Sequence, residues 1–252
     1  MVYNSLTEAP RNLKESFDWL IAVKGTDAEK NVKALGAAIH KFLADKPVGV
    51  TRIPSLEKVK RLSRDFMQKA ELKNMPMVKE MLVSFNAPVA KHASSARHLL
   101  GEYSSDYKNV IQERRLRPGN ISDSVARIVG SCDIFVEGVK TPGQYESAYS
   151  SEATWDASCA KNPEACAIVF VGIAPMLYAG IDSLWMASDP DTFLGQTPAG
   201  AKSMVNVMKA LGFTEQECSG VMSFAKVRPA LRVLNRDIME QIYDLAGFWA
   251  FY

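Results

Sequence analysis

The most apolar stretch of the 252-residue chain, Ala165–Ala187, reads Ala-Cys-Ala-Ile-Val-Phe-Val-Gly-Ile-Ala-Pro-Met-Leu-Tyr-Ala-Gly-Ile-Asp-Ser-Leu-Trp-Met-Ala. Its uncharged part ends at Ile181 and is close to the minimum for a membrane-spanning helix, which needs roughly 17–25 residues. Pro175 should kink this helix, because proline removes a backbone donor and crowds the preceding turn. We predict a buried, Pro-kinked central helix and no membrane span.

Amphipathic helical patterns continue on both sides of this stretch. Apolar residues recur at three- and four-residue steps, and capping residues separate the segments. Asn12 can cap the first helix, and Gly25 stands where a left-handed residue ends it. Two of the predicted helices are Tyr145–Cys159 and a single C-terminal helix, Pro229–Tyr252. The predicted fold class is all-α, with about ten helices packed around the central one.

The domain organisation predicted from the sequence is a single helical domain over residues 1–252. The chain has no internal repeat and no low-complexity linker. Apolar content thins over residues 84–95, which marks a weak boundary between two lobes as the alternative.

Charge and composition narrow the classes of partner. The chain carries 30 basic and 28 acidic residues, a net charge of +2, and 47% of its residues are hydrophobic. These proportions are typical of a globular protein. Because the basic and acidic residues nearly balance, the chain has no overall positive field that would attract nucleic acid. Met1–Glu8 lacks a basic segment followed by an apolar one, so we expect no cleavable signal peptide there.

The four cysteines leave two interpretations open. None belongs to a Cys-x-x-Cys motif or lies near a histidine, so no zinc site is predicted. In the first interpretation, all four are buried free thiols in a reducing compartment. In the second, Cys159 and Cys166 are bridged, because the helix stop and start in Ala160–Ala165 could bring them together. A bridge there would imply an oxidising compartment. The four are Cys132, Cys159, Cys166 and Cys218.

The sequence carries no recognisable catalytic motif. A Gly-rich phosphate loop, a His-Glu-x-x-His pair and a Gly-x-Ser-x-Gly elbow are all missing. His92 and His98 are six residues apart, which places them on different faces of a helix, and His40 borders an apolar stripe. We therefore expect no enzyme activity, no cofactor and no metal.

Two features are candidates for a contact with a protein partner. One is the aromatic C-terminus, which one helix cannot direct into a single core. Either other parts of the chain bury these side chains, or some meet a partner or a continuing sequence. The second is the loop 188–197, which carries two large apolar residues. No polar tail follows the last residue, so we expect the chain to continue into a longer polypeptide. The candidate contact residues are Phe248, Trp249, Phe251, Tyr252, Phe193 and Leu194.

Segments at both ends and in the middle of the chain resemble antigens of piroplasm parasites of the Babesia kind. They are Ser5–Glu15, Asp18–Leu20, Lys24–Asp27, Asp45–Gly49, Tyr145–Trp155 and Tyr243–Tyr252. The chain looks like the variant erythrocyte surface antigens and the large two-hundred-kilodalton antigens, which share such openings. The similarity would cover most of the chain.

The resemblance implies a non-enzymatic antigen or structural domain, with no catalytic residues to carry over. In the surface-antigen branch it would act at the infected erythrocyte surface, in adhesion or immune evasion. In the large-antigen branch it would lie inside the parasite beside a long coiled region. Two further alternatives are an intracellular scaffolding module that oligomerises and a small-ligand carrier with a pocket beside Pro175.

Overall fold

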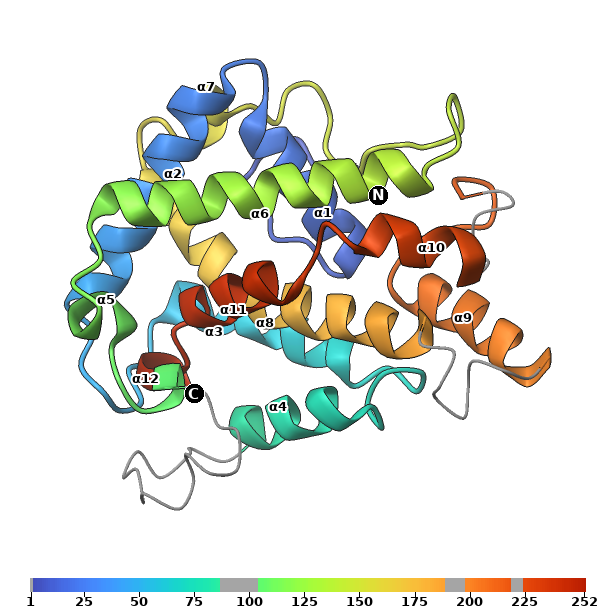
Figure 1. Cartoon of the computed structure of the whole chain (residues 1–252). Coiled ribbons are helices and arrows are strands. Elements are labelled where there is room, and N and C mark those ends of the chain that lie inside the picture. The colour runs from blue at the N-terminus through green and yellow to red at the C-terminus, as the bar shows by residue number, and fades with distance from the viewer. Residues whose placement is uncertain (1, 87–103, 189–197, 219–223) are drawn as a thin grey trace.

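Helix α8, Pro163–Ser188, runs through the middle of the molecule with other helices around it (Figure 1). It includes the whole apolar stretch Ala165–Ala187, and Pro175 lies inside it. Every residue from Val169 to Ile181 is buried. Within the described residues, α8 is the one helix long and apolar enough to cross a membrane, but 89% of its most apolar window is buried inside the molecule. It is therefore a core helix, and the described residues show no clear membrane span.

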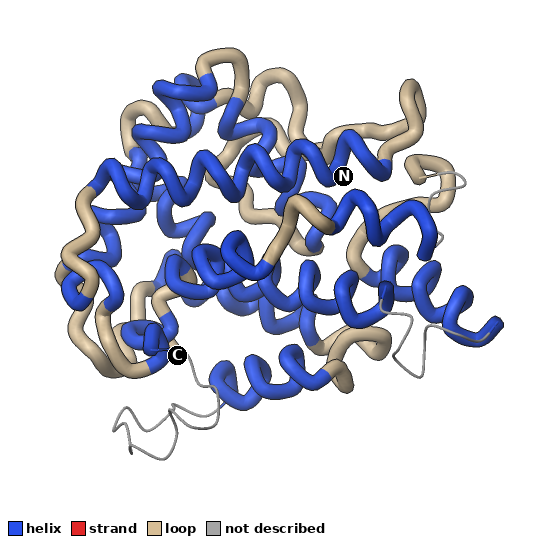
Figure 2. Tube along the Cα trace, in the orientation of Figure 1, coloured by secondary structure: helices blue, strands red, loops and turns tan. Residues whose placement is uncertain are grey.

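The computed structural model describes residues 2–86, 104–188, 198–218 and 224–252. These residues form an all-α fold without strands, as predicted (Figure 2). The helices besides α8 are α1 Leu13–Lys24, α2 Ala28–Ala44, α3 Pro54–Met67, α4 Pro76–Asn86, α5 Val110–Glu113, α6 Pro118–Val139, α7 Trp155–Ser158, α9 Pro198–Ala210, α10 Phe224–Leu231, α11 Arg236–Leu245 and α12 Phe248–Phe251, with a 3-10 turn η2 at Ser104–Asp106.

Two glycines allow the longest helices to pack closely. A Cβ on Gly172 of α8 would lie 2.6 Å from the side chain of Val59 in α3, and Ser63 of α3 donates to the backbone oxygen of Gly172 over 2.6 Å. Gly36 of α2 lies against the backbone of Ser122 in α6. Side chains at these two positions would push the helices apart, so both glycines set the spacing of the core.

The start and end signals of α1 act as predicted. Asn12 accepts the backbone N–H of Glu15 through its side chain, with 2.9 Å between the atoms. Gly25 has a φ of 51°, in the left-handed region that disfavours other residues. Its N–H bonds to the oxygen of Ile21 and ends the helix.

The helix predicted for Tyr145–Cys159 is wrong over most of its length. Only Trp155–Ser158 is helical, and the preceding segment lies extended beside the N-terminus. Tyr3 bonds through its N–H to the oxygen of Ala148 and through its oxygen to the N–H of Ser150. The rings of Tyr3 and Tyr149 stack with 4.8 Å between centroids. These long-range bonds replace the local ones of a helix.

The single helix predicted for Pro229–Tyr252 is also wrong. The chain leaves helical conformation after Leu231 and again at Gly247, which has a φ of 69°. A Cβ at Gly247 would lie 2.8 Å from the ring of Phe251, so the turn needs a glycine. The break turns α12 back against the molecule, where it lies beside η2 (Figure 1).

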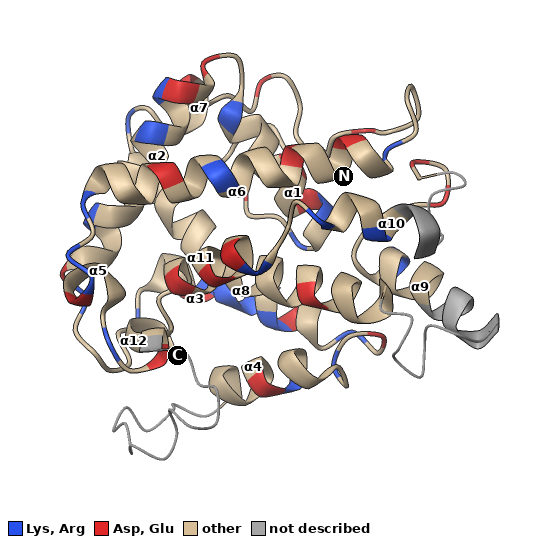
Figure 3. Ribbon diagram, viewed as in Figure 1, with Lys and Arg blue, Asp and Glu red and all other residues tan. Residues whose placement is uncertain are grey.

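The buried apolar side chains of the described residues form one cluster. The lobe boundary proposed near 84–95 falls mostly outside the described residues. Lys and Arg are interspersed with Asp and Glu over the helices in view (Figure 3).

Candidate functional site

The structure joins Cys159 and Cys166 by a disulfide, with 5.9 Å between their Cα atoms. The bridge ties the end of α7 to the first turn of α8, and both cysteines are fully buried. Cys132 and Cys218 are free and buried. Burial raises the pKa of both thiols, that of Cys218 to about 11, so neither is an activated nucleophile.

The C-terminal aromatic residues do not form the exposed partner contact that we predicted. Other parts of the chain bury them, which was the alternative. All four side chains are at most 3% exposed. The turn at Gly247 allows them to face different neighbours, which one helix could not do. Phe251 packs on Phe42 with 5.6 Å between ring centroids. The backbone oxygens of Trp249 and Ala250 accept N–H groups of the loop before α3, those of Gly49 and Thr51. The buried residues are Phe248, Trp249, Phe251 and Tyr252.

The second pair of predicted contact residues, Phe193 and Leu194, lies outside the described residues, and so do His92 and His98. His40 is half-buried, and its Nε2 is 3.0 Å from the backbone oxygen of Leu116. Among the described residues, no group of three or more histidine, cysteine, aspartate or glutamate side chains could hold a metal ion.

A buried ionic cluster joins three distant parts of the chain. Lys14 Nζ in α1 is 3.1 Å from Asp18 Oδ2, one turn along the helix, and 3.0 Å from Glu217 Oε1. It also donates to the backbone oxygen of Glu146 over 2.5 Å and lies 4.6 Å from the ring centroid of Tyr145. The ammonium thus has acceptors for all three of its protons.

The carboxylates of the ionic cluster have further donors. Asp18 accepts from the hydroxyl of Tyr145 at 2.7 Å and from the N–H of Ala148 at 2.9 Å. Glu217 Oε2 accepts from the N–H and hydroxyl of Thr214, at 3.1 and 2.8 Å. The hydroxyl of Thr214 accepts the N–H of Glu217 in return. This is the reciprocal pairing of a capping box.

The electrostatics of the ionic cluster suit a structural role. Burial lowers the pKa of Lys14, but Asp18 and Glu217 outweigh it and the net shift is upward. Burial alone would raise the pKa of the Glu217 carboxyl, but hydrogen bonds from Lys14 and Thr214 hold this pKa below its ordinary value. A charged, fully bonded Lys14 has no lone pair for nucleophilic or base chemistry. The cluster therefore fastens α1 to the loops at 145–148 and 214–217.

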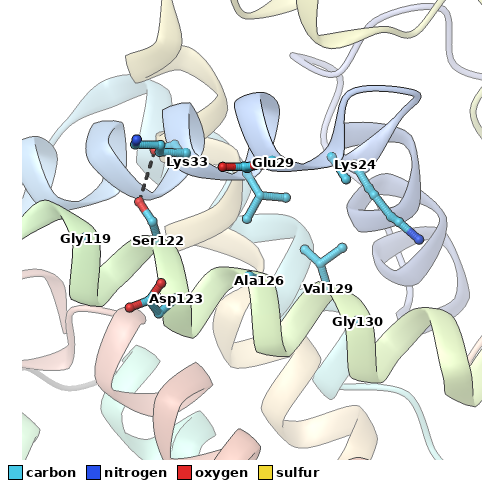
Figure 4. A pocket seen from close by; sticks show the side chains of 11 residues that line it. Lys24, Glu29, Lys33, Gly119, Ser122, Asp123, Ala126, Val129 and Gly130 are labelled. Carbon is cyan, nitrogen blue, oxygen red and sulfur yellow. Dashed lines mark hydrogen bonds between the residues drawn. The ribbon is translucent and has the colours of Figure 1, made fainter.

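One of the hollows open to the surface lies between α2 and α6 (Figure 4). Its volume is about 400 Å³. Val32 and Val129 form its floor and are 6% and 2% exposed. We call this hollow the α2–α6 groove. It is lined by Lys24, Ala28, Glu29, Val32, Lys33, Gly119, Ser122, Asp123, Ala126, Val129 and Gly130.

Two contacts bound the α2–α6 groove along its length. At one end, Gly36 meets Ser122, whose hydroxyl donates to the backbone oxygen of Lys33 over 3.1 Å (Figure 4). At the other end, Lys24 Nζ is 2.7 Å from Asp133 Oδ2. The close approach at Gly36 holds α2 against α6 at one end, and the pair of Lys24 with Asp133 joins the last residue of α1 to α6 at the other.

The rim of the α2–α6 groove carries both signs of charge. Glu29 and Lys33 stand on the α2 side and Asp123 on the α6 side, all three exposed. The walls between rim and floor are small residues, Ala28 and Ala126. An apolar floor with small walls and a charged rim can receive aliphatic side chains and orient the charged groups beside them.

Sequence reasoning missed the α2–α6 groove. A signal was present, because Gly119, Ala126 and Gly130 place small residues along one face of the helix that carries them. Hydrophobic periodicity does not register small residues as a stripe, and nothing in the sequence states which helix lies opposite.

No protein-family model matches this chain, and neither a curated protein nor a solved structure matches it.

Proposed function

We propose that this chain is a non-enzymatic antigen domain that acts through protein–protein contact, with the α2–α6 groove as its contact surface. The resemblance to piroplasm antigens in segments such as Ser5–Glu15 and Tyr145–Trp155 supports the antigen assignment. Adhesion or immune evasion at the infected erythrocyte is the role proposed for it.

The α2–α6 groove is the observation that carries the contact proposal. Its floor is apolar, and the approach of Gly36 to the backbone of Ser122 sets the distance between α2 and α6 at one end of it. A partner helix with aliphatic residues three and four positions apart fits such a groove. A basic group beside them would meet Asp123, and an acidic group would meet Lys33.

A pair of matched variants tests the contact surface. Ala126 is exposed and lines the groove, so Ala126→Trp fills the hollow without disturbing the core. Ala157 of α7 is exposed and does not line the groove, so Ala157→Trp is the control. The three proteins serve as baits for red-cell membrane proteins and for parasite lysate.

The proposal expects a protein that the native chain and Ala157→Trp capture and that Ala126→Trp does not. Capture from red-cell membranes supports adhesion, whereas capture from the lysate alone supports the scaffolding alternative. Equal capture by all three baits, or capture by none, contradicts the groove as contact surface.

The hollows that border α2, α3 and α8 do not include Pro175, so no observation favours a ligand site at the proline.

A further inference from the structure

Residues Asn120-Ile121-Ser122 form an Asn-x-Ser tripeptide in which the middle residue is not proline. This tripeptide is the acceptor for N-linked oligosaccharides in proteins that pass through the secretory route. It occurs once in the sequence. A tripeptide of this kind is weak evidence alone, so its surroundings in the fold decide what it means.

The side chain of Asn120 is placed as a glycan would require. Asn120 is exposed in the first turn of α6. Its Oδ1 accepts the N–H of Arg117 over 2.9 Å, and the hydrogen bonds of the described residues leave Nδ2 unused. A Cβ on the neighbouring Gly119 would meet no atom within 4 Å, so the surface beside Asn120 is open. The first turn of α6 lies at the edge of the molecule, next to α5 (Figure 1).

The disulfide is a second, independent observation that points to the same compartment. Disulfides form and persist where the surroundings are oxidising, such as the lumen of the secretory route. The structure bridges Cys159 and Cys166 and buries both. A chain that acquires this bridge in the secretory lumen also meets the enzymes that glycosylate Asn-x-Ser.

We propose that Asn120 carries an N-linked oligosaccharide. The donor is an oligosaccharide linked through a diphosphate to a membrane lipid. Asn120 Nδ2 forms a bond to the first sugar carbon, and the bond from that carbon to the diphosphate oxygen breaks. The lipid diphosphate leaves with the electron pair, and one amide proton passes to a carboxylate of the transferase. The linked nitrogen keeps its other proton, and Oδ1 still accepts from Arg117.

The structure also dictates when the transfer occurs. The hydroxyl of Ser122 is bonded to the oxygens of Lys33 and Pro118, at 3.1 and 3.0 Å, and Ser122 is 8% exposed. The transferase needs this hydroxyl, which α2 covers once it packs on α6. Transfer to Asn120 therefore precedes the packing of these two helices, and the folded, unmodified protein is not a substrate.

The decisive material is the full-length protein from its native cells, because the native secretory route must be intact. Trypsin releases the peptide Leu116–Arg127, since the Arg117–Pro118 bond resists cleavage. Mass spectrometry is expected to find this peptide with an added mass that contains N-acetylhexosamine. Unmodified Asn120 overturns the proposal, whether Cys159 and Cys166 are bridged or reduced.

Matched variants test acceptance by the transferase directly. The full chain is translated behind a cleavable leader in the presence of microsomes, and an endoglycosidase-sensitive mobility shift is scored. Asn120→Asp keeps an acceptor for the Arg117 N–H but has no amide nitrogen, so the shift should vanish without loss of the fold. Ser122→Ala should also abolish it, and Ser124→Ala should retain it. A native chain without a shift contradicts the proposal.

Discussion

At the scale of single residues, the ammonium of Lys14 is the most demanding group in the fold. Lys14→Met removes the cation between Asp18 and Glu217 and leaves their carboxylates buried without it. We expect the free energy of unfolding to fall by about 3–5 kcal/mol, as when one partner of a buried pair is removed. Urea denaturation followed by circular dichroism measures this loss.

A solvated ion pair provides the control for Lys14. Lys30 and Asp156 are 3.2 Å apart, with side chains 58% and 73% exposed. Lys30→Met should therefore change the stability by less than about 1 kcal/mol, because water and salt screen such pairs. Equal effects of the two substitutions would show that the ionic cluster adds nothing beyond a surface pair.

Asp182 on α8 makes stability depend on pH. Burial raises the pKa of this carboxyl from 3.8 to about 6. The folded state therefore holds its proton more tightly than the unfolded state, and stability is lost as the pH rises from about 4 to 6. Asp182→Asn should stabilise the protein by roughly 1–3 kcal/mol above pH 6 and have little effect near pH 4. Urea denaturation at the two pH values measures it, and an equal gain at both would refute this cause.

The sequence predicted the local contacts of single residues but not the distant ones. The cap of Asn12 joins residues three apart, and it is found. The pair of Lys14 with Glu217 spans most of the chain. No spacing rule connects residues so far apart, so the ionic cluster could not be predicted from the sequence.

At the scale of helices, the spacing of α2 and α6 depends on Gly36. Gly36→Ala would place a Cβ in collision with the backbone of Ser122, which cannot move as a side-chain end can. We expect a loss of about 1–3 kcal/mol, because overpacking forces backbone shifts. Thermal unfolding of the two proteins measures it.

Gly119→Ala is the matched control, since the added methyl group would meet no atom within 4 Å. Alanine favours a helix over glycine, so this variant should be stabilised by up to about 1 kcal/mol. A loss at Gly119 as large as that at Gly36 would mean that helix packing does not explain the effect.

Two helices were predicted wrongly for one physical reason. Tyr145 and Tyr149 are four residues apart, which fits a helix face, yet Tyr145 binds Asp18 and Tyr149 stacks on Tyr3. The periodicity of apolar residues indicates which residues are buried, and the prediction took a helix to be the cause of that burial. In the segment of Tyr145 and Tyr149, contacts with residues distant in sequence bury the side chains instead. In the C-terminal segment, a left-handed turn at Gly247 brings the aromatic side chains into the core.

At the scale of the whole molecule, the sequence predicted that α8 is a buried helix, because a long uncharged run favours burial. It did not predict that α2 and α3 pack on α8 or that α6 packs on α2, because this packing depends on the shapes of the surfaces that meet. The α2–α6 groove exists through that arrangement and could not be anticipated. The partner contact at Phe193 and Leu194 remains a prediction, because both residues lie outside the described part of the chain.

The disulfide should contribute measurably to global stability. Replacing both Cys159 and Cys166 by alanine opens a short loop, and we expect a loss of about 2–3 kcal/mol from the added freedom of the unfolded chain. Differential scanning calorimetry of the native and double-variant proteins measures it. Reductant should lower the melting temperature of the native protein and leave that of the double variant unchanged.

The inward fold of Gly247–Tyr252 has a practical consequence for serology. An antibody raised against a synthetic peptide of these six residues would be directed at side chains that the native molecule hides. Such a reagent should stain the denatured chain on a blot and pass over intact protein in solution.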